Sequence, residues 1–249
     1  LLVAKFAIGA ILGILVGRIF GPAGILGISS MAIICAVTNS NGSVYYALMQ
    51  TYGDDIDCAC MPILAINDGP FLTLVALGAS GLADIPIMSL VAALVPIIAG
   101  MILGNLDNKV TEFFGPVGDA IIPFTGFSLG AGIDLANVLK GGVSGIVLGL
   151  ITIFIGGGFI YLCDHFIGRR PGYAAWAVAT TAGNAVAVPA VIGTADPAWA
   201  EFVGTATVQV AASTVLSALL VPFIVSWWAK KFGCPKFPKE AKAEKASGK

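Results

Sequence analysis

The chain has 249 residues, of which 57% are hydrophobic and 11% are charged, with a formal net charge of −1. A soluble domain carries about 25% charged residues, so this composition excludes an ordinary soluble domain and predicts an all-α integral membrane protein. Seven lysines stand between residues 230 and 249. In a chain of this class they predict a solvated basic tail, and not a nucleic-acid-binding surface.

Eight apolar segments are long enough to be membrane-spanning helices, because about 20 apolar residues cross the hydrocarbon core of a bilayer. Two of the eight carry polar residues at their centres. In chain order, the predicted spans are residues 1–20, 25–49, 56–81, 85–106, 110–129, 138–162, 173–192 and 199–228.

The two interrupted spans share one design. Residues 25–49 contain a run of amide, hydroxyl and glycine residues from Thr38 to Ser43, and residues 173–192 contain a similar run from Thr180 to Asn184. An unsatisfied polar group in hydrocarbon costs on the order of several kcal/mol, so such runs need protein or a wet cavity around them. Two interrupted spans in corresponding positions indicate a transporter binding site with two crossed, discontinuous helices.

An offset of 142 residues relates the two interruptions and places Thr38 on Thr180. The same offset lays the first three predicted spans over the last three. The predicted topology gives these triplets opposite orientations, so we expect an inverted repeat.

The repeat divides the chain into three parts. Two spans of the second repeat have no partner in this sequence, so we expect a ten-span parent whose first two spans precede Leu1. The predicted parts are residues 1–81, the last three spans of the first repeat; residues 85–229, five spans of the second repeat; and residues 230–249, a basic and disordered cytoplasmic tail.

Basic residues in the loops predict the orientation, since they concentrate on the cytoplasmic side. With the basic tail inside, eight spans place Leu1 inside as well. Lys5, Lys109, Arg169 and Arg170 then also lie inside, which predicts a multi-pass protein of the cell (inner) membrane with a cytoplasmic C-terminus.

The second half of a broken helix begins with free backbone N–H groups and a positive dipole end, which suit an anion such as a carboxylate. Asparagine side chains both donate and accept hydrogen bonds, as sugar hydroxyls require. The alternative is that these polar residues only hold the two breaks together. The predicted substrate-binding residues are Thr38, Asn39, Ser40, Asn41, Gly42, Ser43, Thr180, Thr181, Gly183 and Asn184.

Asp68 is predicted to lie deep inside a span, where an ionisable residue indicates function. We expect it to carry a coupled proton or to bind a coupling cation, with Asn67 and Gln209 as polar neighbours. The alternative is a permanently ionised Asp68 that is hydrogen-bonded to the nearby break. Asp119 is the next candidate.

No pattern indicates an enzyme, a resident cofactor or a metal site. Cys58-Ala59-Cys60 lacks the spacing and the partners of a metal site. Gly156-Gly157-Gly158 is not followed by the Lys-Ser/Thr of a nucleotide-binding loop. The expected function requires only a coupling ion, a proton or, as the alternative, sodium.

The run from Thr38 to Gly53 resembles the 2-keto-3-deoxygluconate permease family. Further similar pieces are Asp68–Thr73, Gly104–Asp107, Ile122–Phe124 and Gly132–Leu135. The resemblance covers the chain to about Lys231. Asp68 stands where a family member has Glu, and Asn41 where it has Gly.

The resemblance implies proton-coupled uptake of 2-keto-3-deoxygluconate, a sugar acid from pectin breakdown, across a bacterial or archaeal plasma membrane. It also implies a fold like that of bile acid/sodium symporters. The alternatives are a sodium-coupled symporter for an organic anion and, less favoured, a passive channel. The sequence leaves the oligomeric state open.

Overall fold

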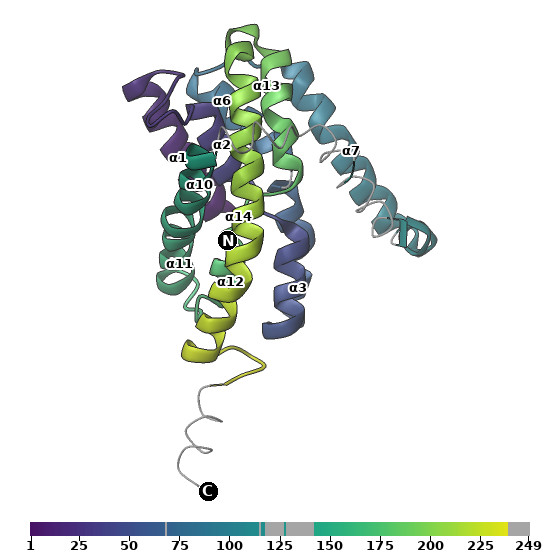
Figure 1. Ribbon diagram of the computed structural model, residues 1–249. Helices are drawn as coiled ribbons and strands as arrows, with labels where there is room; N and C mark the ends of the chain where they lie inside the picture. The colour runs from purple at the N-terminus through teal and green to yellow at the C-terminus, as the bar shows by residue number, and fades with distance from the viewer. Residues whose placement is uncertain (68, 115, 118–126, 128–141, 239–249) are drawn as a thin grey trace, which may run out of the picture.

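The computed structural model describes residues 1–67, 69–114, 116–117, 127 and 142–238, and within them every regular element is a helix (Figure 1). The predicted all-helical class is therefore confirmed for this part of the chain. The elements are α1 (Leu2–Phe20), α2 (Ser30–Thr38), α3 (Gly42–Tyr52), α4 (Asp55–Ala59), α5 (Met61–Leu64), η1 (Ala65–Asn67), α6 (Pro70–Ser80), α7 (Ile87–Leu106), α10 (Gly142–Leu150), η2 (Ile151–Gly156), α11 (Gly157–Phe166), α12 (Tyr173–Ala177), η3 (Asn184–Ala187), α13 (Val188–Ala195), η4 (Pro197–Trp199) and α14 (Ala200–Phe232).

Four helical segments in the described residues are long and apolar enough to cross a membrane. A fifth results if the segments Asp55–Asn67 and Pro70–Ser80, which meet at a bend of 52°, form one span. The four are Leu2–Phe20, Ile87–Leu106, Gly142–Phe166 and Pro197–Phe232.

With the bent pair counted as one span, the described residues contain five spans, which is fewer than the predicted eight for two reasons. Residues 25–49 and 173–192 are interrupted, so neither forms one long helix. Most of residues 110–129 lie outside the described part of the chain. The count of eight spans and the inverted repeat therefore stay predictions.

Glycines bring α1 against α2. A Cβ atom on Gly9 would lie 2.5 Å from the backbone nitrogen of Thr38, and one on Gly13 would collide with the Ile34 side chain. Only a residue without a side chain fits at such a distance, and small residues allow close helix packing in lipid. The contacts pair Gly9 with Thr38 and Gly13 with Ile34, so the two helices run antiparallel.

The 33-residue helix α14 runs along the whole bundle, with α10 and α11 on one side and α13 and α3 on the other (Figure 1). It extends as far as Phe232, so Lys230 and Lys231, which the sequence assigned to the tail, are helical. Ser213 and Ser217 lie on its buried face and contact Thr181 of the second polar interruption.

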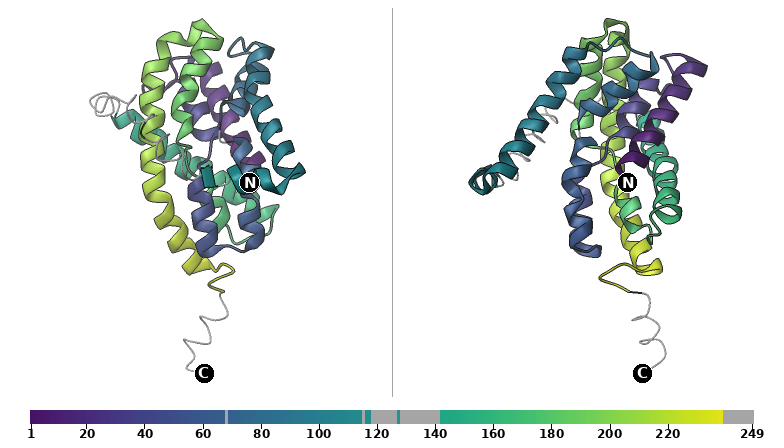
Figure 2. Two further views of the ribbon diagram at one scale, coloured as in Figure 1. Left: turned by 90° about the vertical axis from the view of Figure 1, so that its right-hand side faces the viewer. Right: turned by 180° about the vertical axis from the view of Figure 1, so that it is seen from behind.

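Helix α7 leans away from the other helices, as Figure 1 and the right-hand view of Figure 2 show. Within its apolar window, none of the residues whose exposure is described is buried. Its connection to the bundle runs through α6 and the turn at Gly81, whose positive φ of 66° is accessible to glycine at no cost.

Candidate functional site

The first helix break separates α2 from α3. Helix α2 ends at Thr38, and α3 begins at Gly42, where Asn41 Oδ1 accepts a hydrogen bond of 3.0 Å from the Val44 N–H group. Asparagine at this position satisfies one of the N–H groups that a helix start exposes. The polar run therefore ends one helix and starts another, and the interruption predicted for residues 25–49 is confirmed.

Two buried side chains hold the first break together. Thr38 Oγ1 donates to the Ile34 carbonyl at 2.6 Å and lies 3.1 Å from Thr73 Oγ1 on α6. Asn39 Nδ2 donates to the Cys35 carbonyl at 2.8 Å and to Thr73 Oγ1 at 3.1 Å. Buried polar groups are costly unless hydrogen-bonded, so these bonds stabilise the break inside the bundle.

The second break lies between Ala177, the last residue of α12, and Asn184, the first residue of η3. Hydroxyl groups of α14 support it. The Thr181 N–H group donates to Ser217 Oγ at 2.9 Å, and Thr181 Oγ1 lies 2.7 Å from Ser213 Oγ. The interruption predicted for residues 173–192 is thus also confirmed.

The two breaks touch each other. The Asn41 N–H group donates to Thr180 Oγ1 at 2.9 Å, across 139 residues of sequence. Thr181 Oγ1 donates to the Ala36 carbonyl at 3.2 Å, across 145 residues. The structure therefore brings together the two polar runs that the sequence identified as halves of one site.

Lys5 lies beside the second break. Its side chain is 0% exposed, and its Nζ atom donates to the Thr180 carbonyl at 2.8 Å. The sequence predicts Lys5 among the basic residues of the cytoplasmic side, but its side chain is buried in the bundle and does not lie in a loop. Helix α1 already begins at Leu2, so Lys5 lies one turn inside it and cannot report which side of the membrane the loop faces.

The predicted binding residues fall into two groups by exposure. Ser43 and Asn184 are exposed, and Asn41 and Gly183 are half-buried, so a ligand can reach them. The remaining six are buried inside the bundle at the two breaks. These six are Thr38, Asn39, Ser40, Gly42, Thr180 and Thr181.

A second polar centre, absent from the sequence predictions, joins α4 to the loop before α12. Asp57 is 0% exposed and forms an ion pair with Arg170, while the Tyr173 hydroxyl donates to Asp57 Oδ2 at 2.6 Å. Burial lowers the pKa of Arg170. Its hydrogen bond to Tyr173 and the nearby Asp57 carboxylate raise the pKa by more than burial lowers it. The net shift is upward, so the guanidinium stays charged.

The sequence holds one local signal for this centre. Asp54 and Asp57 form a capping box at the start of α4, in which each side chain accepts from the other residue's backbone N–H group. That pattern predicts the helix start. It does not predict the partner of Asp57, which lies 113 residues further along the chain.

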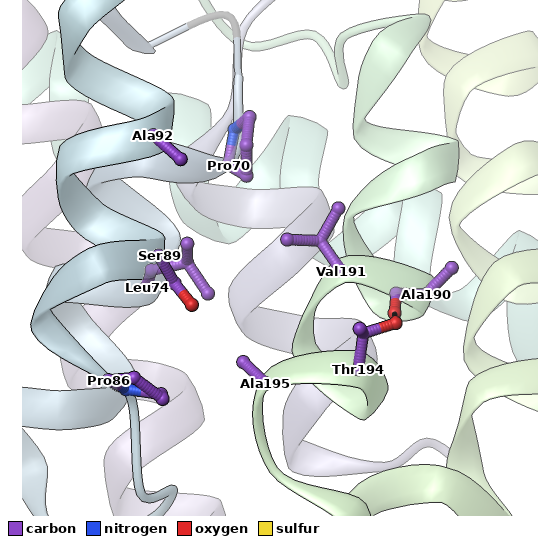
Figure 3. A pocket seen from close by; sticks show the side chains of 9 residues that line it. All are labelled: Pro70, Leu74, Pro86, Ser89, Ala92, Ala190, Val191, Thr194 and Ala195. Atoms are coloured by element: carbon purple, nitrogen blue, oxygen red, sulfur yellow. Dashed lines mark hydrogen bonds between the residues drawn. The ribbon is translucent and has the colours of Figure 1, made fainter.

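A cavity of about 560 Å³ lies between α6 and α7 on one side and α13 on the other (Figure 3). Its wall is mainly apolar, with hydroxyl groups from Ser89 and Thr194. No predicted site residue lines it, so this cavity is separate from the contact between the breaks. The lining residues are Pro70, Leu74, Pro86, Ser89, Ala92, Ala190, Val191, Thr194 and Ala195.

A family model described as 2-keto-3-deoxygluconate permease matches residues 1–234. The chain belongs to this family. It is 48% identical over 227 residues to 2-keto-3-deoxygluconate permease 1 of Salmonella typhimurium, covering 91% of this chain and 71% of that protein. It is 36% identical over 236 residues to the 2-keto-3-deoxygluconate permease of Bacillus subtilis, covering 93% and 72%. No solved structure matches the chain.

Membership of the permease family confirms the resemblance drawn from the motifs. It also makes the chain a transporter-family protein and not an enzyme. Together with the apolar helices, it identifies a multi-pass membrane protein.

Of the four residues predicted to couple transport to an ion, the structure describes two, Asn67 and Gln209. Asp68 and Asp119 lie outside the described residues. Asn67 is buried at the end of η1, with no hydrogen-bond partner for its amide among the described residues. Gln209 Nε2 donates to the Gly27 carbonyl at 2.6 Å, which ties α14 to the loop between α1 and α2.

Proposed function

We propose that this permease-family chain is a secondary active transporter that imports 2-keto-3-deoxygluconate, or a similar sugar-acid anion, together with protons. The contact between the two breaks carries the proposal, because discontinuous helices that meet inside a bundle are the usual binding site of such transporters. The names of the Salmonella and Bacillus relatives support the choice of substrate.

The chemistry of the breaks suits an anion with hydroxyl groups. Helix α3 and the η3–α13 segment both begin at the breaks, and each start presents a positive dipole end, roughly +0.5 of an elementary charge. Asn41 and Asn184 stand at these starts and are accessible. We infer that the helix starts bind the carboxylate and that the two amides bind sugar hydroxyls.

We also infer that the two halves are inverted repeats. A shift of 142 residues lays α1 over the span Gly142–Phe166. It places Thr38, which ends α2, on Thr180, and Gly42, which starts α3, on Asn184, which starts η3. A repeat of this kind supports alternating access, in which one half rocks against the other around a fixed site.

Uptake into proteoliposomes of the complete protein tests the proposal. A pH gradient, acidic outside, is applied at equal sodium on both sides, and a sodium gradient is applied separately at constant pH. We expect the pH gradient to drive accumulation of labelled 2-keto-3-deoxygluconate above its outside concentration. Accumulation with sodium alone supports the sodium-coupled alternative, and equilibration without accumulation under both gradients supports a passive channel.

A further inference from the structure

Lys5 is a buried ionisable side chain for which the site described above has no stated role. An ammonium group has three N–H donors, and within the described residues one of them has a partner, the Thr180 carbonyl at 2.8 Å. The ion pair found in that part of the chain joins Arg170 to Asp57 and does not involve Lys5. When protonated, Lys5 brings a positive charge to the breaks, and it has no ion-pair partner among the described residues.

The packing of α1 on α2 places Lys5 level with the first break as well. Gly9 lies against Thr38 and Gly13 against Ile34, so a step of four residues along α1 matches a step of four, in the opposite direction, along α2. Lys5 precedes Gly9 by one helical turn on the same face of α1, so it lies beyond Thr38, where α2 ends and the first break begins. Lys5 is thus aligned with one break and hydrogen-bonded to the other.

Both breaks contain oxygen acceptors. The Thr180 carbonyl follows the C-terminal end of α12, where the helix dipole is negative. In the first break, Asn39 Oδ1 and Ser40 Oγ are buried and have no hydrogen-bond partner among the described residues. Carbonyl, amide and hydroxyl oxygens bind hard cations, and in broken-helix transporters such groups coordinate the coupling sodium ion.

We propose that the ammonium group of Lys5 is the resident cation of the two breaks. It occupies the place that a bound sodium ion would take at the unwound carbonyls, and its charge balances the carboxylate of the bound substrate. This inference rests on the proposed function. It assigns the cation role at the breaks to a side chain, which makes sodium unnecessary for transport and leaves the coupled proton to another group.

The test measures substrate binding and uptake with and without sodium in the complete protein. Lys5→Arg keeps the charge, Lys5→Met keeps the chain length without charge, and Lys5→Ser opens space for an ion. Lys109→Met removes an exposed lysine and serves as the matched control. Sodium and methylammonium are each added to every variant at constant pH.

We expect binding and uptake by the native protein, Lys5→Arg and Lys109→Met to be insensitive to sodium. Losing a hydrogen-bonded charge should weaken binding by Lys5→Met about 10- to 150-fold. Sodium or methylammonium should restore substrate binding and uptake to the Lys5→Ser variant, because either cation can occupy the position that the ammonium group leaves. A lysine that only fills space would give no such rescue.

Three results would overturn the inference: sodium stimulation of the native protein, unchanged binding by Lys5→Met, or a folded Lys5→Ser variant that neither cation restores. If Lys5→Ser does not fold, the other two variants decide. The inference requires that Lys5→Met loses substrate binding and that Lys5→Arg retains it. A native protein that transports no sugar acid refutes the proposed function itself, so the two failures are distinguishable.

Discussion

The backbone N–H group of Asn41 donates to Thr180 Oγ1 at 2.9 Å, and this hydrogen bond joins two helix breaks that lie 139 residues apart. The Thr180 carbonyl simultaneously accepts from Lys5 Nζ. One threonine therefore connects the first break, the second break and α1. Variants at this contact test whether the breaks act as one unit.

Replacing Thr180 with Val removes the hydroxyl acceptor and leaves the Asn41 N–H group without it. An unsatisfied buried donor costs about 1–3 kcal/mol, so we expect a lower melting temperature in detergent and weaker substrate binding. Thr51→Val is the control, because Thr51 is exposed and bonds only to Ala47 of its own helix among the described contacts. Equal melting temperatures for both variants would contradict the prediction.

The ion pair between Asp57 and Arg170 predicts an asymmetric result. Breaking a buried pair by removing one partner costs about 3–5 kcal/mol, because a charge remains unpaired. Asp57 is fully buried, whereas the Arg170 side chain is 32% exposed and can turn toward water. We therefore expect Arg170→Gln to lower the free energy of unfolding more than Asp57→Asn does.

The double variant completes this comparison. Since neither charge is then left alone, its loss of stability should be smaller than the sum of the two single losses. Chemical unfolding in micelles measures all three variants. Additive losses would show that the two side chains act independently.

Replacing Gly9 with Ala tests the close approach of α1 to the first break. The added Cβ atom would lie 2.5 Å from the Thr38 backbone nitrogen, and a backbone atom cannot move aside as a flexible side chain can. Overpacking of this kind costs about 1–3 kcal/mol. We expect lower thermal stability and weaker substrate binding, because α1 must move away from the breaks.

Gly100→Ala is the matched control for Gly9→Ala. Gly100 lies in α7, and a Cβ atom added there meets nothing within 4 Å in the described structure. Alanine is favoured over glycine in a helix by about 0.5–1 kcal/mol, so this variant should be as stable as the native protein or more so. Equal stability of the two alanine variants would contradict the packing prediction.

Asn41 and Asn184 are predicted to contact the substrate. Replacing either with Leu removes a hydrogen bond to a sugar hydroxyl, which costs about 0.5–1.5 kcal/mol, or roughly 2- to 12-fold in affinity. Titration calorimetry with 2-keto-3-deoxygluconate measures this loss. Asn41→Ser is the control for stability, since Ser also caps helices and should preserve the start of α3. Native affinity in both Leu variants would refute the site.

Asp68 is predicted to carry the transported proton, and Asp68→Asn mimics its protonated form. We expect this variant to lose accumulation driven by a pH gradient. Exchange of labelled for unlabelled substrate should survive, because exchange needs no net proton movement. Both are measured in proteoliposomes. Accumulation by Asp68→Asn under a pH gradient alone would show that another residue carries the proton, with Asp119 the next candidate.

The sequence correctly predicted the features that depend on contiguous segments. The length of apolar runs gives the membrane class, and polar runs such as Thr38–Ser43 cannot continue a helix through hydrocarbon unsupported, so the breaks appear where they were expected. The motif around the first break also identified the family correctly. The number of spans was less accessible, because an interrupted segment is one apolar run in sequence but two short helices in space.

The tertiary structure alone decided which polar groups meet. Lys5 looks like a solvated lysine near the end of a span, yet close packing at Gly9 and Gly13 carries its ammonium group to the Thr180 carbonyl, 175 residues away. Likewise, nothing local pairs Asp57 with Arg170. Hydropathy and helix breaks are properties of neighbouring residues, whereas these contacts form only when distant helices pack together and bring buried polar groups within hydrogen-bonding distance.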